Sequence, residues 1–160
     1  MPAVTVSLAA ADLGKRLQER LRGLSAAAGN TVLWQQNANR VLVHVDSLQS
    51  RLLNGWLLCN LDLQSDQTGR QTLQFIFFLG DDSNGNGISA GATINAPSAP
   101  AAQLAELWGA TVQRVLWDAV LDTLEAMLDQ TAARFSGQPV ALGGFQASQN
   151  GLSAVVLAGD

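Results

Sequence analysis

Cys59 and His44 are the only cysteine and the only histidine in the chain, and a thiol beside an imidazole base is the usual form of a cysteine nucleophile. Cys59 follows Trp56-Leu57-Leu58, a context typical of a small buried side chain. His44, two positions before Asp46, is expected at the surface or near a hairpin end. A hydrolytic enzyme that uses Cys59 or the carboxylates is therefore the least favoured class of function.

The residues between the two side chains indicate that they lie far apart. Asn54-Gly55 is a strong signal for a two-residue hairpin turn, and this turn would set His44 opposite Ser65. At about 3.3 Å per strand residue, the imidazole and Cys59 would be separated by about 20 Å. A β-bulge is also predicted over residues 46–49, because two groups of apolar residues on this segment are out of phase. These groups are Val41, Val43 and Val45 on one side and Leu48 and Leu52 on the other.

Oxygen-bearing side chains alternate over residues 81–87, as they do at the start of a calcium-binding loop. The twelfth residue counted from Asp82 is Thr93, where such a loop needs a bidentate glutamate. No glycine-rich turn is placed to hold a phosphate, and one histidine cannot form a histidine-rich metal site. We therefore expect no cofactor and no metal.

Four carboxylates share one face of a predicted helix at spacings of i, i+4, i+7 and i+11. They are Asp118, Asp122, Glu125 and Asp129. A di-metal carboxylate site would need these groups to face inward and a Glu-x-x-His pair beside them, which this helix lacks. The first interpretation is a solvated acidic face. The alternative is a docking strip for a basic partner, or for the basic residues of another subunit: Arg16, Arg20 and Arg22.

The composition favours one folded domain over residues 1–160 with little charge to cover its surface. Hydrophobic residues make up 48% of the chain and charged residues only 14%, against roughly 25% charged residues in average proteins. The net charge of −4 argues against nucleic acid as a partner. No apolar run approaches the roughly 20 residues of a membrane helix. With no secretory signal expected and a single cysteine, the predicted location is the cytoplasm.

Periodicity predicts a first helix over residues 7–24 and a long helix over residues 101–135, with a bend near Gly109. Extended segments lie between them, and Asn150-Gly151 predicts a hairpin over residues 140–157. The fold class is therefore α+β: an antiparallel sheet of about five meandering strands plus a C-terminal hairpin, with an N-terminal helix and one long helix packed on it. The five strands are predicted over residues 31–35, 40–53, 56–64, 70–79 and 88–95.

Two regions carry more apolar residues than one covered face needs. On the central strands, large side chains occupy positions that would face water in a one-sided sheet: Trp56, Leu58, Ile76 and Phe78. On the long helix, apolar residues including Trp117 and Leu121 cover most of the circumference between residues 112 and 128. Either the chain covers these regions with its own first helix and tail hairpin, or they form a subunit or partner interface.

These features favour a non-catalytic protein-binding or assembly module, a homodimer that could also bind another protein. The order of helix, antiparallel strands, helix and further strands is similar to small acidic secretion chaperones of bacteria, which dimerise and hold unfolded effector segments. Structural subunits of phages or injection machines fit equally well. The alternative is a carrier of a small apolar ligand, with a cavity lined by Trp34, Trp108, Phe75 and Phe77.

Overall fold

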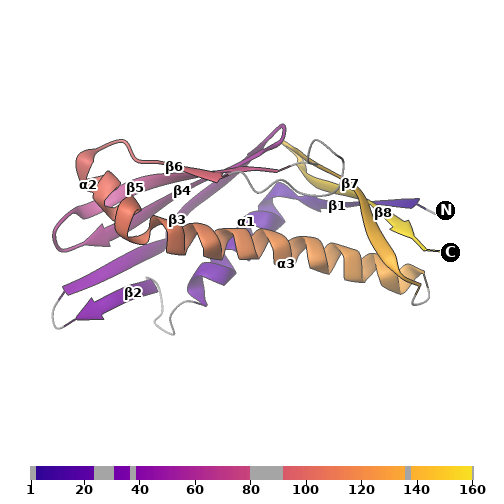
Figure 1. Ribbon diagram of the computed structural model, residues 1–160, viewed down its shortest axis with the longest axis horizontal. Coiled ribbons are helices and arrows are strands. Elements are labelled where there is room, and N and C mark those ends of the chain that lie inside the picture. The colour runs from indigo at the N-terminus through magenta and orange to yellow at the C-terminus, as the bar shows by residue number, and fades with distance from the viewer. Residues whose placement is uncertain (1–2, 24–30, 37–38, 80–91, 136–137, 160) are drawn as a thin grey trace.

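The computed structural model describes residues 3–23, 31–36, 39–79, 92–135 and 138–159 (Figure 1). Runs of antiparallel strands are separated from the helices along the chain, as in an α+β protein, which confirms the predicted class. The elements are β1 (Ala3–Ala9), α1 (Ala10–Arg22), β2 (Thr31–Gln36), β3 (Asn39–Leu53), β4 (Trp56–Ser65), β5 (Gly69–Phe78), β6 (Ala92–Asn95), α2 (Ala99–Leu104), the π-helical segment η1 (Ala105–Gly109), α3 (Ala110–Arg134), β7 (Val140–Ser148) and β8 (Gly151–Ala158).

The strands form two antiparallel sheets. The larger one is the predicted meander, in the order β2-β3-β4-β5-β6. The smaller one has the order β1-β8-β7, so the predicted tail hairpin pairs with a strand from the start of the chain. In Figure 1 the long helix runs along the longest axis of the molecule, past the five-stranded sheet toward one end and the three-stranded sheet toward the other.

The strand β1 corrects the prediction of a helix from residue 7. Residues 3–9 are extended, and Val4, Val6 and Leu8 alternate with exposed residues along the strand. Alternation with a period of two is the pattern of a half-buried strand. The helix α1 begins at Ala10, where the leucine spacing of four takes over, and Leu13, Leu17 and Leu21 are buried as expected.

The β3–β4 hairpin follows the predicted register near its turn and departs from it beyond the bulge. Leu53 pairs with Trp56, and Gly55 has a φ of 78°, a left-handed conformation that glycine adopts readily. The pairing shifts between His44 and Gln49, which confirms the bulge. While β4 advances by two residues, β3 advances by five, so His44 lies opposite Asp62 and not opposite Ser65.

Ser47 replaces the strand hydrogen bonds that the bulge interrupts. Its Oγ accepts a hydrogen bond from the Asp62 backbone amide at 2.8 Å and donates one to the His44 carbonyl at 2.6 Å. Ser47→Ala should lower the free energy of unfolding by about 1–3 kcal/mol, because the Asp62 amide would lose its acceptor. Urea denaturation measures this change.

The control is Ser153→Ala, at a half-buried serine of β8 whose hydroxyl forms no hydrogen bond with the described residues. It should cost less than about 0.5 kcal/mol. Equal costs for the two variants would show that Ser47 does not hold the bulge.

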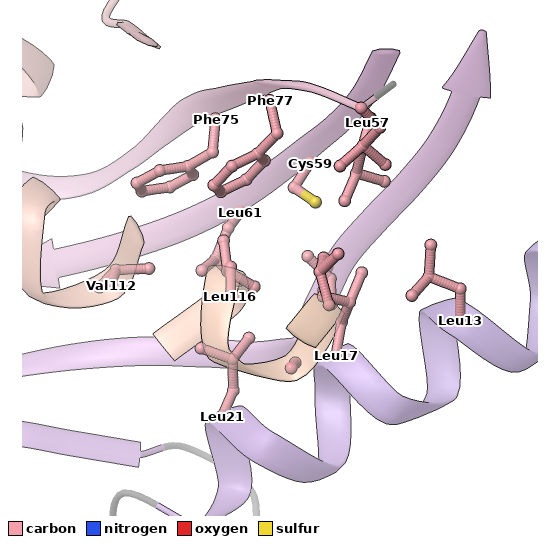
Figure 2. Close-up of a cluster of buried hydrophobic side chains, with 14 of the residues drawn as sticks. Leu13, Leu17, Leu21, Leu57, Cys59, Leu61, Phe75, Phe77, Val112 and Leu116 are labelled. Carbon is pink, nitrogen blue, oxygen red and sulfur yellow. The ribbon is translucent and has the colours of Figure 1, made fainter. Parts of the chain in front are cut away.

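The main core lies between one face of the five-stranded sheet and the helices. Figure 2 shows Cys59, Phe75 and Phe77 of the strands facing the leucines of α1 and the side chains of Val112 and Leu116 on α3. Phe77 also stacks on Trp117 of α3, with ring centroids 5.9 Å apart. We call this the inner face of the sheet. Its residues are almost entirely buried.

The long helix is continuous over 36 residues, from Ala99 to Arg134. Ser98 begins it, since its Oγ accepts a hydrogen bond from the Ala101 amide at 3.2 Å. Gly109, where a bend was predicted, is the last residue of the π-helical turn. A Cβ on Gly109 would come within 2.7 Å of Ile94 Cδ1, so glycine lets β6 approach the helix closely.

Candidate functional site: the outer face of the five-stranded sheet

The structure does not bring Cys59 and His44 together. Cys59 is fully buried on the inner face, and burial raises the pKa of its thiol to about 12. His44 pairs with Asp62 on the opposite face, which we call the outer face. A thiol that stays protonated at neutral pH, with no base beside it, is not an activated nucleophile.

His44 is only 9% exposed, so the prediction of a surface position is wrong. The bulge moves it away from the end of the hairpin and places it against β4, where its Nε2 lies 2.8 Å from Gln64 Oε1. Asp46, which was expected beside it, points to solvent and pairs with Arg22 of α1 at 2.9 Å.

The half of the outer face next to the β4–β5 turn is polar. Asp62 Oδ2 accepts a hydrogen bond from Arg70 Nε at 2.7 Å, and Asp62 Oδ1 accepts one from Thr72 Oγ1 at 2.6 Å. Partial burial alone would raise the pKa of the Asp62 carboxyl. The hydrogen bonds from Thr72 and Arg70, with the positive charges of Arg70 and His44, outweigh it and lower the pKa below its ordinary value.

The other half of the outer face is apolar, and we call it the apolar end. It consists of two cross-strand pairs, Trp56 with Phe78 and Leu58 with Ile76. Trp56 is 43% exposed, and the other three side chains are half-buried. The rings of Trp56 and Phe78 meet edge to face with centroids 5.2 Å apart. Such pairs stabilise a sheet, but they leave apolar surface open to water here.

Among the described residues, neither the first helix nor the tail hairpin covers the apolar end. The helix α1 packs on the inner face, and the tail hairpin pairs with β1 in the other sheet. The hairpin touches the larger sheet at its tip, where the Gly55 amide donates a hydrogen bond to the Ala147 carbonyl at 3.1 Å. Trp56 keeps its exposure beside this contact.

The acidic face of α3 meets a basic residue of its own chain. Arg20 of α1 lies 2.8 Å from Asp122 and 3.9 Å from Asp118, and all three side chains are about half exposed. Glu125 and Asp129 are exposed and form no ion pair within the described residues. A docking strip for a partner therefore stays a prediction, and two of its four carboxylates already have a cation nearby.

The apolar residues predicted on the long helix have different environments. Trp117 is half-buried against Phe77 and so belongs to the core, whereas Leu121 is 42% exposed. The aromatic residues proposed to line a ligand cavity also separate. Phe75 and Phe77 are packed in the core, while Trp108 lines a pocket at the end of the sheet. The side chain of Trp34 lies outside the described part of the structure.

No family model, curated protein or solved structure matches this chain. Within the residues that the structure describes, no helix is both long and apolar enough to cross a membrane. The same residues contain no group of three or more metal-ligating side chains. Residues 81–87, with their resemblance to a calcium loop, lie outside the described residues.

Proposed function

We propose that this chain is a non-catalytic assembly protein that forms a homodimer through the outer face of its five-stranded sheet. The observation that carries the proposal is the apolar end, where Trp56 is 43% exposed beside three half-buried apolar side chains. Exposed apolar surface of this kind commonly marks a protein–protein contact. A single buried thiol suits a reducing compartment such as the cytoplasm.

A second copy of the chain is the partner that the charges of this face favour. The Asp62 carboxylate is paired with Arg70 at 2.7 Å, and amide residues lie between this pair and the apolar end: Asn60 and Gln74. In a two-fold contact the same surface of each copy meets itself, so an unbalanced charge would face a charge of its own sign. Because the charges of Asp62 and Arg70 balance, two such faces can meet without this repulsion. The exposed Arg51 lies opposite Leu58 and forms no ion pair with the described residues. The two copies must therefore meet with their Arg51 side chains apart.

The size of the face limits the strength of the dimer. Strands β4 and β5 are each 10 residues long, and β3 runs beside them. At about 4.8 Å between strands and about 3.3 Å per residue, three strands present roughly 500 Å². A standard interface buries about 800 Å² per partner, so we expect a dissociation constant in the micromolar range.

The likeness to secretion chaperones adds little to this proposal. That likeness depends on a chain that begins with a helix, whereas β1 precedes α1 here and completes the three-stranded sheet. The proposal therefore depends on the sheet face, and binding of a second protein would be an additional property of the dimer.

Trp56→Glu tests the proposal, because it would bury a charge without a partner in the apolar part of the contact. Light scattering coupled to size-exclusion chromatography, over a series of concentrations, should show a dimer for the unaltered chain and at least about a 100-fold weaker dimer for the variant. Trp56 is 43% exposed, so the variant should still fold, as circular dichroism would verify.

The matched control is Leu121→Glu, at a leucine of α3 that is 42% exposed. It should leave the dimer intact. If Leu121→Glu dissociates the dimer and Trp56→Glu does not, the contact runs through the long helix and the sheet-face proposal is wrong. A monomer at all concentrations for the unaltered chain would reject dimerisation altogether.

A further inference from the structure

A pocket of about 310 Å³ opens at one end of the main core, beside Ser65, the last residue of β4. Trp56 is the first residue of the same strand and lies at the other end. Three parts of the chain form it: the start of β3, the β4–β5 turn, and the helix around the π-helical segment. Its volume falls at the lower end of the range for small-molecule sites, about 300–1,000 Å³. Wide π-helical turns often occur at functional sites.

The apolar part of the lining comes from both layers of the core. Val41 of β3 and Leu104 of α2 are almost fully buried, and Trp108 is half-buried beside them. Leu107, on the same helix, is 64% exposed and is the most exposed large apolar side chain among the described residues. An exposed leucine next to a buried one extends the apolar surface from the pocket toward the solvent.

The polar residues of the lining bond mainly to one another. Ser65 and Thr68 hydroxyls lie 2.7 Å apart, and Gln103 Nε2 donates a hydrogen bond to Gln67 Oε1 at 3.2 Å, joining the helix to the turn. Asp66 Oδ2 accepts a hydrogen bond from the Arg40 backbone amide at 3.2 Å. These contacts shape the pocket and leave few free groups to recognise a strongly polar ligand.

Among the described residues that line the pocket, Arg40 supplies the only positive charge. Its guanidinium is exposed and forms no ion pair with the described residues, Asp66 included. Guanidinium groups pair with carboxylates in a planar, two-bonded geometry. An apolar lining with one unpaired arginine therefore suits an apolar molecule that carries one carboxylate.

A small molecule fits this pocket better than an extended peptide. A peptide that adds to a sheet needs a free strand edge for its main-chain hydrogen bonds. The strand β3 is paired on both sides, with β2 and with β4, so it offers no such edge at the pocket. At about 30 Å³ for each non-hydrogen atom, the volume of one water molecule in the liquid, the pocket holds roughly ten atoms.

We propose that this pocket binds a medium-chain monocarboxylate, with the chain against Leu104, Leu107 and Trp108 and the carboxylate at Arg40. A dicarboxylate of the same length would bring its second charge against these apolar side chains, so the site distinguishes a monocarboxylate from a dicarboxylate. This proposal is independent of the homodimer, because the pocket and the apolar end lie at opposite ends of β4.

The probe is octanoate, titrated into the ¹⁵N-labelled chain of residues 1–160 and followed by NMR at the side-chain amides of Gln67 and Gln103 and at the Trp108 indole. We expect saturation at one site with a dissociation constant of about 0.1–1 mM, as the ligand's size allows. Octanol, which lacks the charge, and octanedioate, which has a second one, should each bind at least about threefold more weakly.

Variants separate the two parts of the site. Arg40→Gln should weaken octanoate by about fivefold and leave octanol unchanged. Leu107→Gln should weaken both ligands by about 3- to 10-fold, because it removes apolar contact area. The control, Leu121→Gln, changes another exposed leucine of the long helix and should alter neither affinity.

Two outcomes would overturn the assignment. The pocket has no such ligand if octanoate gives no saturable shifts at several times the expected dissociation constant. The role of Arg40 is wrong if octanol binds as tightly as octanoate, or if Arg40→Gln leaves the octanoate affinity unchanged. A loss of dimerisation in Trp56→Glu would affect neither result.

Discussion

Gly151→Ala should destabilise the protein by at least about 3 kcal/mol, the largest effect that we expect of a single methyl group in this chain. Gly151 begins β8, the central strand of the three-stranded sheet, and pairs with Ala9 on one side and Ser148 on the other. Its φ of 151° is a conformation that residues with a side chain rarely adopt.

The environment of Gly151 makes the strain hard to relieve. A Cβ at this position would overlap the carbonyl oxygen of Leu8 and approach Ala9 Cα to 3.1 Å. Both are backbone atoms of β1, which cannot move aside without breaking its pairing with β8. We therefore expect the substitution to separate β1 from the sheet. Urea denaturation gives the loss in stability, and amide hydrogen exchange in β1 gives its location.

Gly69→Ala is the matched control. Gly69 also has a positive φ, 67°, but a Cβ there would meet no atom within 4 Å. The control should cost only about 1–2 kcal/mol, the price of the left-handed conformation alone. If the two variants are equally stable, the contact with β1 contributes nothing and the pairing of β1 with β8 is in doubt.

The thiol of Cys59 should react with a disulfide reagent at least about a thousandfold more slowly in the native protein than in the urea-unfolded chain. Burial raises its pKa from 9.0 to about 12, and this shift alone lowers the thiolate fraction by about that factor. Full enclosure among the core residues shown in Figure 2 slows the reaction further. Absorbance of the released thiol measures the rate.

A control thiol at an exposed position of the same sheet distinguishes the effect of burial from the intrinsic reactivity of the reagent. The double variant Cys59→Ala, Gln49→Cys places the thiol at an exposed position of β3 and should react rapidly without urea. Native Cys59 reacting as fast as this exposed thiol would mean that the inner face is open to solvent.

The same shift gives Cys59 a defined effect on stability at high pH. Above pH 9.0 the thiol ionises in the unfolded chain but stays protonated in the folded one until the pH nears 12. The unfolded chain then binds fewer protons, so stability falls as the pH rises through this window. Cys59→Ala should remove this part of the pH dependence, as denaturation on either side of pH 9.0 would show.

Local patterns predicted those features that depend on neighbouring residues. Asn54-Gly55 specified the turn and the first pairs of the β3–β4 hairpin, and the phase change between Val45 and Leu48 specified the bulge. The number of extra residues in the bulge was not predictable, because insertions of different lengths can shift the alternation of apolar residues in the same way. His44 was placed at the wrong position for this reason.

Features assembled from distant residues were missed. The strand β1 pairs with β8 from the other end of the chain, and no local signal connects them. Its alternation of Val4, Val6 and Leu8 was the available sign, but the leucine spacing of the following helix dominated the prediction. The pocket combines Arg40, the β4–β5 turn and Leu107, and no spacing within the sequence relates these three.

The pairing of β1 with β8 also determines when folding can be completed during synthesis. Ala3 lies opposite Leu157, so β1 has no native partner until residue 157 has left the ribosome. At about 5–20 residues per second, this delay is roughly 10–30 s. The meander of β2 to β6 needs only nearby partners, so its long hairpins can form while β1 still waits as an unpaired apolar strand.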